Sequence, residues 1–379
     1  MQNIPLFKIY WDSHDIQAVS EVIKSGKNWA IGQKVEELEK KVAAYVGTKY
    51  AVTFNSGTSG LHALLLAYGI KAGDEVIVPS FTFIATANVC LMAGAKPVFA
   101  EIERENYGLD PKDVERKITK KTKAIIAVHC GGLGCKIREL KAIADRHGLV
   151  LLEDAAEALG AAIAKKKVGT FGRAAMFSFC SNKVISTGEG GVIVTDSKAI
   201  YEKLKLLRSH GRAETANYFT SSEYIDYVQL GYNFRMSNIT AALGISQLGK
   251  LSKVIELRQN NAKYLSKKLE SIPHIKTPLV PKGYTHIYQM FTIYIEGGRK
   301  IRDGLQKYLH EKGVGTKVYF YPIHKTSFYR KKYHCKKGFL PITEGISDSV
   351  LTLPMYPGLA KKEMDFMAKE IEKFFNKKV

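Results

Sequence analysis

Residues 178–191 read SFCSNKVISTGEGG and place a single lysine, Lys183, among small and polar residues. An apolar run, residues 174–179, overlaps the start of this stretch, and a strand-like run, residues 192–195, follows it. Burial of a lysine beside the end of a strand favours its neutral amine, which is a nucleophile toward aldehydes. Taken alone, however, a lysine in a glycine-rich turn is more often a surface residue, so the surrounding sequence has to decide.

Short apolar strands and helical segments alternate on both sides of this stretch, over about residues 50–240. This alternation predicts an α/β fold, in which a mostly parallel sheet is covered by helices on both faces. Strands are predicted at residues 51–54, 75–78, 97–100, 124–128, 150–153, 176–179 and 191–195. Helices are predicted between them at residues 58–68, 82–92, 111–118, 137–147 and 198–207.

The two ends of the chain have a different rhythm. Apolar residues with helical spacing predict two helices before the sheet, at residues 14–25 and 33–46, and a long helix at 239–269. After it we expect a strand at 289–295, a helix at 301–312, a strand at 316–320 and a last helix at 361–375. The sequence thus predicts a large α/β domain, residues 1–245, followed by the long linking helix and a small C-terminal α+β domain, residues 246–379.

Composition excludes several classes of protein. The 379 residues are 45% hydrophobic and 25% charged, which is ordinary for a globular protein. No apolar run reaches the length of about 18 residues that a membrane span requires, and the N-terminus lacks the pattern of a signal peptide. Five scattered cysteines, with no CxxC pair, argue against a disulfide framework and a zinc site. We therefore expect a cytoplasmic protein without a metal or membrane partner.

The formal net charge of +21 is best explained by a lysine-rich solvated surface. The basic segments carry no recognisable nucleic-acid-binding module, so we expect no nucleic-acid partner. Attraction of a phosphorylated small molecule would also fit this charge, although the charge alone does not establish it.

Three segments place unusual chemistry at the ends of predicted strands, where ligands bind in open α/β sheets. The turn Asn55-Ser-Gly-Thr-Ser59 is either a phosphate site at a helix N-terminus or a plain helix cap. Asp154 closes an apolar strand and either meets a cation or caps the following turn. Together with Lys183, these segments meet three requirements for holding pyridoxal phosphate: a phosphate turn, a carboxylate for the ring nitrogen, and an amine for the aldehyde.

Over nearly its whole length the sequence resembles the nucleotide-sugar aminotransferases of the DegT/DnrJ/EryC1/StrS type, which have the type I fold of aspartate aminotransferase. Among the matching segments are LLEDAAEALGA, KVGTFGRAAMFSFCSNKVISTGEGGVIVT, GYNFRMSNITAALGISQL and YFYPIH. This resemblance implies a seven-stranded type of sheet in the large domain. It also implies pyridoxal 5'-phosphate as cofactor, with pyridoxamine phosphate as its intermediate form.

The resemblance also implies site residues, position by position. Lys183 is the catalytic lysine that bonds to the cofactor, and Asp154 is the partner of its ring nitrogen. The other implied cofactor-binding residues are Thr58 and Ser59 of the phosphate turn, Ser178 beside them, Phe83 stacked on the ring, Glu157 near the ring oxygen, and Asn233, which reaches the phosphate of a neighbouring subunit. Asn233 thereby implies a homodimer with shared active sites, and His324 matches a position that contacts the nucleotide sugar.

The reaction implied is transfer of an amino group from L-glutamate to a nucleotide-linked keto sugar. Three segments are most similar to perosamine synthases, which aminate C4 of GDP-4-keto-6-deoxymannose; UDP- or dTDP-linked keto sugars aminated at C4 or C3 are alternatives. A non-catalytic, cofactor-sensing regulator is a remote alternative. One branch of the family replaces the lysine by histidine and dehydrates sugars, but Lys183 is present here. Arg173 departs from the family's usual aspartate and could change the field at the site.

Overall fold

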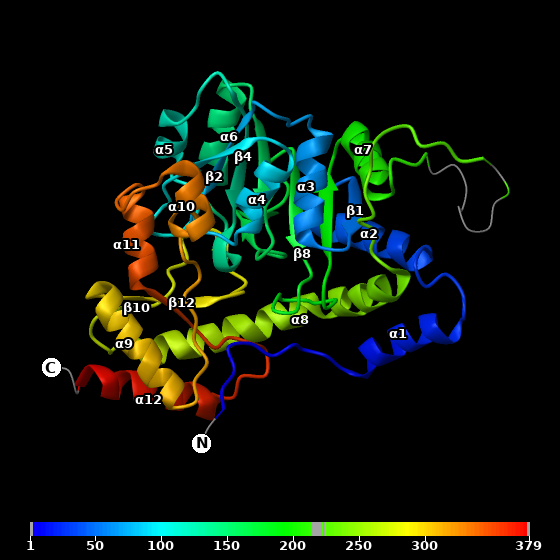
Figure 1. The fold of residues 1–379 in the computed structure, drawn as a ribbon. Helices are drawn as coiled ribbons and strands as arrows, with labels where there is room; N and C mark the ends of the chain where they lie inside the picture. Colours follow the sequence, from blue (N-terminus) through cyan, green and yellow to red (C-terminus); the bar gives the residue numbers. More distant parts are fainter. Residues whose placement is uncertain (1–2, 214–221, 223, 377–379) are drawn as a thin grey trace.

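The computed structural model describes residues 3–213, 222 and 224–376, and its centre is a seven-stranded sheet (Figure 1). The strand order is β1-β9-β8-β5-β4-β2-β3. β9 runs antiparallel to both of its neighbours, and the other neighbouring pairs are parallel, so the predicted mostly parallel sheet is confirmed. The strands are β1 (Tyr50–Phe54), β2 (Glu75–Pro79), β3 (Lys96–Ala100), β4 (Thr122–Val128), β5 (Val150–Asp154), β8 (Ala174–Ser178) and β9 (Gly191–Thr195).

Both faces of this sheet are buried, which explains the continuous apolar strands. In β4, Ile126 faces the cluster that contains α3, α4 and α7, whereas Ile125 faces the cluster that contains α5 and α6. Alternate residues of a strand point to opposite faces, so a sheet covered on both sides needs apolar residues throughout. These helices are α3 (Gly57–Ala67), α4 (Ala85–Met92), α5 (Pro111–Arg116), α6 (Ile137–Arg146) and α7 (Lys198–Arg208).

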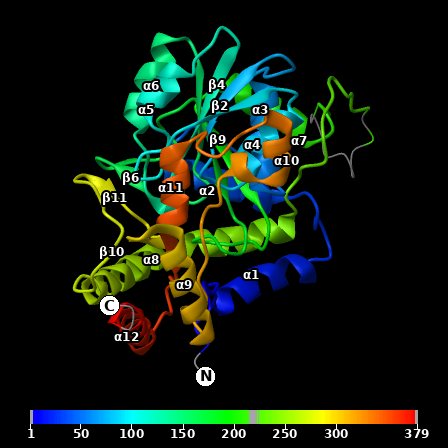
Figure 2. The same cartoon turned by 60° about the vertical axis from the view of Figure 1, so that its left-hand side comes forward.

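A 32-residue helix, α8 (Asn238–Leu269), runs below the sheet from α2 toward the C-terminal part of the chain (Figures 1 and 2). It begins at Ser237, whose hydroxyl accepts the N–H of Thr240 at 3.0 Å, a typical N-cap. Helices α1 (Ser13–Lys24) and α2 (Gln33–Val46) pack along it. Despite this length, no helix in the described ranges is apolar enough to cross a membrane.

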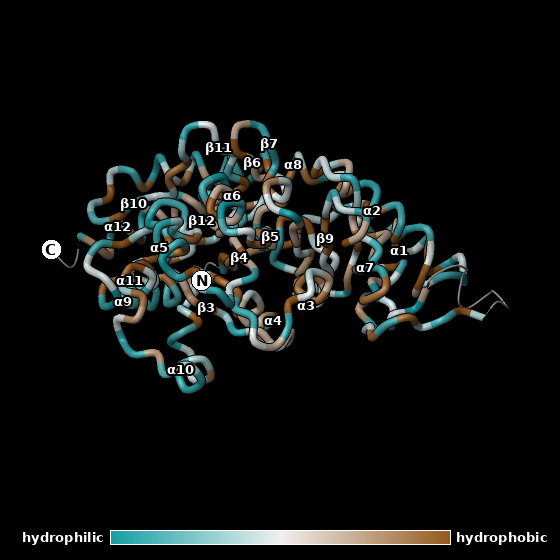
Figure 3. Tube along the Cα trace, turned by 90° about the horizontal axis from the view of Figure 1, so that it is seen from above, coloured by the Kyte–Doolittle hydropathy of each residue, from teal (hydrophilic) through white to brown (hydrophobic). Residues whose placement is uncertain are grey.

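The C-terminal part packs around its own apolar cluster, to which the last turns of α8 contribute. At its edge, α10 contacts α4 through a hydrogen bond from the Tyr329 hydroxyl to Asn88 and lies apart from the main body when seen from above (Figure 3). The elements of this C-terminal part are β10 (Ile275–Lys276), β12 (Phe291–Ile295), α9 (Gly298–Glu311), α10 (Ser327–Tyr333), α11 (Pro341–Ser349), β13 (Val350–Leu353) and α12 (Lys361–Asn376). The division of the chain at residue 245 into two domains stays a prediction.

Two sequence predictions are wrong in detail. Residues 316–320 form no strand: only Lys317 pairs with Thr352 of β13, after which the chain leaves the sheet and borders a cavity. Helix α4 begins at Ala85 instead of Thr82, because residues 80–84 form a turn. The sequence analysis also missed β13 and a small sheet made of β6 (Ala162–Ile163), β7 (Lys166–Lys167) and β11 (Tyr284–Thr285).

A fully buried carboxylate, Glu153 of β5, connects three parts of the large sheet region. Its Oε2 lies 2.9 Å from Nε2 of His129, which follows β4, and accepts the N–H of Gly169 at 2.6 Å. Its Oε1 accepts the N–H groups of Phe171 and Gly172 at 2.8 and 2.6 Å. Burial alone would raise the pKa of Glu153, but His129 and the backbone N–H groups outweigh this effect and lower the pKa.

We predict that Glu153→Gln destabilises the protein by about 3–5 kcal/mol, because an amide NH₂ would face donors that now share two carboxylate oxygens. Glu256→Gln is the matched control: Glu256 pairs with Lys253 on the surface, and its loss should cost less than about 1 kcal/mol. Because the pKa of Glu153 is lowered on folding, its contribution is complete at neutral pH and lost at acidic pH. Denaturant unfolding at neutral and at acidic pH measures the free energy of unfolding of both variants. Equal stability of the two variants at pH 7 would contradict the role of Glu153.

Candidate active site

A cavity of ≈ 740 Å³ lies where β4, β5 and β8 end and α3 begins. Several side chains that the sequence singled out border it, although they come from distant segments. The structure brings together Thr58, Phe83, Asp154, Glu157, Ser178 and Lys183 around this cavity. It therefore lies at the carboxyl ends of parallel strands, the position at which open α/β sheets bind ligands.

Lys183 is a residue of this cavity and not a surface lysine. Its backbone N–H donates to Cys180 O at 3.0 Å, which forms a turn directly after β8. The turn directs the side chain inward, so that only 13% of it is exposed. Its Nζ lies 3.5 Å from Oε1 of Glu157. The amine is thus held next to a carboxylate at the wall of the cavity.

Glu157 is held from the other side by the backbone. Its Oε2 accepts the N–H of Gly131 at 2.8 Å, in the short turn that follows β4. The residue is only 7% exposed, so its two oxygens have fixed and different partners. Oε2 is hydrogen-bonded to the turn after β4, and Oε1 faces Lys183.

Asp154 provides the second carboxylate of the cavity. Oδ2 accepts the hydroxyl of Thr86 at 2.8 Å, and Oδ1 accepts the N–H of Ala156 at 3.2 Å. Burial raises the pKa of Asp154, and within the described residues no basic side chain forms an ion pair with it. A buried carboxylate without a cation is stabilised when a ligand brings one, such as a protonated ring nitrogen.

The N-terminus of α3 faces the same cavity with small residues. Ser56 caps the helix by accepting the N–H of Ser59 at 3.1 Å, while Gly57 and Thr58 border the cavity opposite Ser178. A Cβ on Gly57 would lie 2.8 Å from Sδ of Met176, so a larger residue here would have to displace the end of that side chain. Free N–H groups at a helix N-terminus together with hydroxyls suit a phosphate.

The remaining predicted residues lie at different depths. Phe83 borders the cavity and is 63% exposed, which leaves its ring open to a partner. Ser59 does not border the cavity: its hydroxyl donates to Asn55 Oδ1 at 2.5 Å. Asn233 is exposed outside the cavity, beside Asn55. His324 is fully buried, 2.7 Å from the Ser80 hydroxyl and 3.3 Å from Glu344 Oε1, so it supports the turn before Phe83 from behind.

Arg173 does not enter the cavity. It is exposed directly before β8, where its N–H donates to Leu151 O near the start of β5 and its carbonyl accepts the hydroxyl of Thr195 at the end of antiparallel β9. Arg173 therefore lies at the amino ends of β5 and β8, whereas Asp154 and Ser178 lie at their carboxyl ends. The departure from the family's aspartate therefore lies away from the site.

Sequence reasoning missed two groups that orient the carboxylates, the Thr86 hydroxyl and the Gly131 N–H. The two threonines are four residues apart: Thr82 lies in the turn before α4 and Thr86 in its first turn, and their hydroxyls are 3.2 Å from each other. That spacing was a signal available in the sequence. No sequence signal identifies Gly131, because its contribution comes from the backbone.

The cavity fits pyridoxal phosphate by the chemistry of its donors. Asp154 has no ion-pair partner among the described residues, Phe83 presents an open ring, and the start of α3 offers N–H groups and hydroxyls. Lys183 supplies an amine in the same cavity. The described residues contain no group of three histidine, cysteine, aspartate or glutamate side chains that could hold a metal ion.

Comparison with known proteins agrees with this geometry. The chain is 36% identical to GDP-perosamine synthase from Vibrio cholerae, over 98% of this chain and 99% of that protein. Helicobacter pylori PseC, an aminotransferase of pseudoaminic acid biosynthesis, superposes with a TM-score of 0.92 at 28% identity, covering 99% of this chain and 100% of PseC. A putative sugar aminotransferase from Streptococcus pneumoniae, solved in its PLP form, shares the fold with a TM-score of 0.93 at 24% identity over the whole of both chains.

The model of the DegT/DnrJ/EryC1/StrS aminotransferase family matches residues 10–372. The chain therefore belongs to this family, and it is a pyridoxal-phosphate-dependent aminotransferase with the type I fold.

Proposed function

We propose that the protein transfers an amino group from L-glutamate to C4 of a nucleotide-linked 4-keto-6-deoxy sugar, converting GDP-4-keto-6-deoxymannose to GDP-perosamine. Relatives named GDP-perosamine synthase from Vibrio cholerae, Escherichia coli O157:H7 and Caulobacter vibrioides, at 36%, 34% and 37% identity, support this substrate. The observation that supports this reaction is that the amine of Lys183 and the buried carboxylate of Asp154 border the same cavity, and that Asp154 forms no ion pair within the described residues.

When bound, pyridoxal phosphate supplies an electron sink and carries the amino group between donor and acceptor. Asp154 would hold the protonated ring nitrogen, and Phe83 would stack on the ring. Thr58, Ser178 and the N–H groups of α3 would hold the phosphate, with Ser59 shaping that turn. Lys183 would take the proton from the α-carbon of the amino donor and return it on the product side.

Lys183→Ala should lower turnover by more than about a thousandfold, because the group that moves the proton is removed. The fold should persist, since the side chain lines a cavity and its ion pair in the described part of the chain is with Glu157. The exposed Lys166→Ala is the control and should keep full activity. Turnover with glutamate, together with circular dichroism, measures both effects; a Lys183→Ala variant with full activity would refute the assignment.

We also propose that the active site is completed by a second copy of the chain through Asn233, which is exposed at the surface. Lys183→Ala and Asn233→Asp should each be nearly inactive alone. Refolded as a mixture, half of the dimers carry one intact site, so about a quarter of the wild-type activity should return. A mixture that stays inactive would show that Asn233 acts within its own chain.

The substrate is tested by mass spectrometry of the products formed with pyridoxal phosphate and glutamate. GDP-4-keto-6-deoxymannose should gain an amino group, whereas a UDP-linked 4-keto-6-deoxy sugar should not react. An amino product from the UDP sugar alone would support the proposed reaction and would show that the nucleotide of the substrate is UDP instead of GDP. The Lys183→Ala protein is the control for uncatalysed amination.

A further inference from the structure

Two buried threonines border the catalytic cavity on the side of Asp154. Thr86, in the first turn of α4, is 1% exposed, and Thr82, in the turn before that helix, is 4% exposed. Buried hydroxyl groups are costly unless they are hydrogen-bonded, so the partners of these two define what they do. Both hydroxyls belong to one short chain of hydrogen bonds that ends on the carboxylate of Asp154.

The direction of this chain follows from the chemistry of its last member. An ionised carboxylate only accepts hydrogen bonds, so the Thr86 hydroxyl donates its single proton to Oδ2 of Asp154, at 2.8 Å. The Thr86 oxygen then accepts from the hydroxyl of Thr82, which lies 3.2 Å away. Hydroxyls that donate in series toward a charged acceptor polarise one another, which strengthens the last hydrogen bond.

The carboxylate of Asp154 is held at both of its oxygens. Oδ2 is bound by Thr86 of α4, and Oδ1 accepts the N–H of Ala156 at 3.2 Å, from the turn after β5. Each carboxylate oxygen has two lone pairs, so each keeps one acceptor position beyond these bonds. A ring N–H in the cavity therefore meets a carboxylate whose plane is already fixed.

The same hydroxyl also opposes the cost of burying this charge. Burial is the largest influence on the pKa of Asp154 and raises it, and the Thr86 hydroxyl is the largest influence that lowers it. Two charged neighbours act in opposite directions, since Glu157 raises this pKa and Lys183 lowers it. Loss of the hydroxyl would thus remove the main protein group that favours the anion.

We propose that Thr86 is a positioning residue for the cofactor: its hydroxyl orients and stabilises the Asp154 carboxylate that receives the protonated ring nitrogen, and Thr82 supports it from behind. The proposal rests on the pairing of Asp154 with the ring nitrogen that is part of the proposed function. It does not depend on which sugar is aminated.

Equilibrium binding of pyridoxamine phosphate, measured by calorimetry, tests the proposal without turnover, because this form has no aldehyde to bond to Lys183. Thr86→Val keeps the shape of the side chain and removes its hydroxyl, so it should weaken binding about tenfold. Thr86→Ser keeps the hydroxyl and should restore nearly the wild-type affinity. Thr82→Val should cause a smaller loss, because its hydroxyl acts through that of Thr86.

A second ligand distinguishes positioning from packing. In the carbocyclic analogue of pyridoxamine phosphate, a C–H group replaces the ring nitrogen, so the analogue makes no ion pair with Asp154. Thr86→Val and Asp154→Asn should therefore weaken the binding of pyridoxamine phosphate without weakening that of the analogue. Should Thr86→Val fail to fold, Thr86→Ala serves the same test, because alanine is well suited to a helix.

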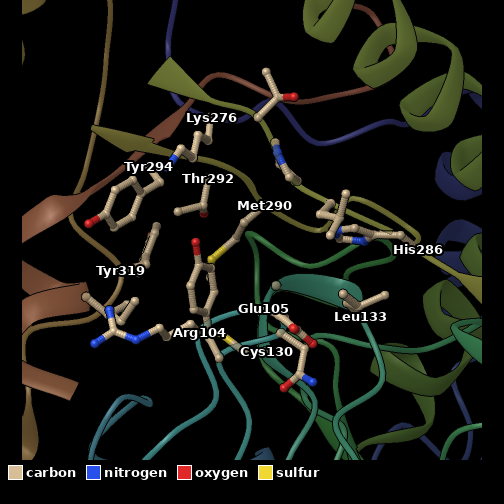
Figure 4. Close-up of a pocket in the computed structure, with 17 residues that line it drawn as sticks. Arg104, Glu105, Cys130, Leu133, Lys276, His286, Met290, Thr292, Tyr294 and Tyr319 are labelled. Atoms are coloured by element: carbon tan, nitrogen blue, oxygen red, sulfur yellow. The ribbon is translucent and has the colours of Figure 1, made fainter. Parts of the chain in front are cut away.

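The matched control is a hydroxyl pair outside the catalytic cavity. Thr292 lies 2.9 Å from the hydroxyl of Thr352 and borders a neighbouring cavity of ≈ 320 Å³, which shares Tyr319 with the catalytic one (Figure 4). Thr292→Val also removes one hydroxyl from a threonine pair, and it should bind both ligands like the wild type.

Unchanged affinity of Thr86→Val for pyridoxamine phosphate, or an equal loss for both ligands, would overturn the proposal, because the hydroxyl would then not act through the ring nitrogen. If Asp154→Asn weakens both ligands equally, the pairing of Asp154 with the ring nitrogen fails and the proposal fails with it. If the selective loss is found while no sugar is aminated, the proposed substrate fails and the positioning role of Thr86 stands.

Discussion

The structure depends on a negative charge placed in its interior, the carboxylate of Glu153. A buried charge is tolerated only when its oxygens are hydrogen-bonded, and here one histidine and three backbone N–H groups meet that demand. The partners come from the turn after β4 and from the segment that leads into β8. The side chain of Glu153 in β5 thus connects the end of β4 with the segment that enters β8.

The next residue, Asp154, points to the other face of β5 and toward the catalytic cavity. Two adjacent carboxylates therefore have opposite roles because a strand alternates its side chains. Glu153 is saturated by protein donors, whereas Asp154 accepts one hydroxyl and one backbone N–H and forms no ion pair within the part of the chain that the structure describes. Glu153, whose hydrogen bonds are complete, therefore supports the fold, whereas Asp154 can still bind a ligand in the catalytic cavity.

Sequence reasoning recovered the parts of the molecule that are determined locally. The alternating strands, the capped start of α3 and the acidic end of β5 carry their signals in neighbouring residues. The edge segment 316–320 looked like a strand but was not one, because pairing depends on how far β13 extends, and β13 was not foreseen. Likewise His324 has the chemistry of a ligand-binding residue, yet its burial against Ser80 and Glu344 depends on three-dimensional packing. Only the structure could place Gly131 and Tyr319.

The helix α8 has 32 residues and is about 48 Å long at 1.5 Å per residue. At its first turn, Oδ1 of Asn238 accepts the N–H of Lys34 in α2 at 2.8 Å. Near its middle, the buried Arg258 donates to the carbonyls of Tyr288 and Met355 at 2.9 Å. A movement of the C-terminal part relative to the sheet would have to break these hydrogen bonds or bend α8. The long helix therefore sets where the C-terminal segments that Arg258 holds lie relative to α2 and the sheet.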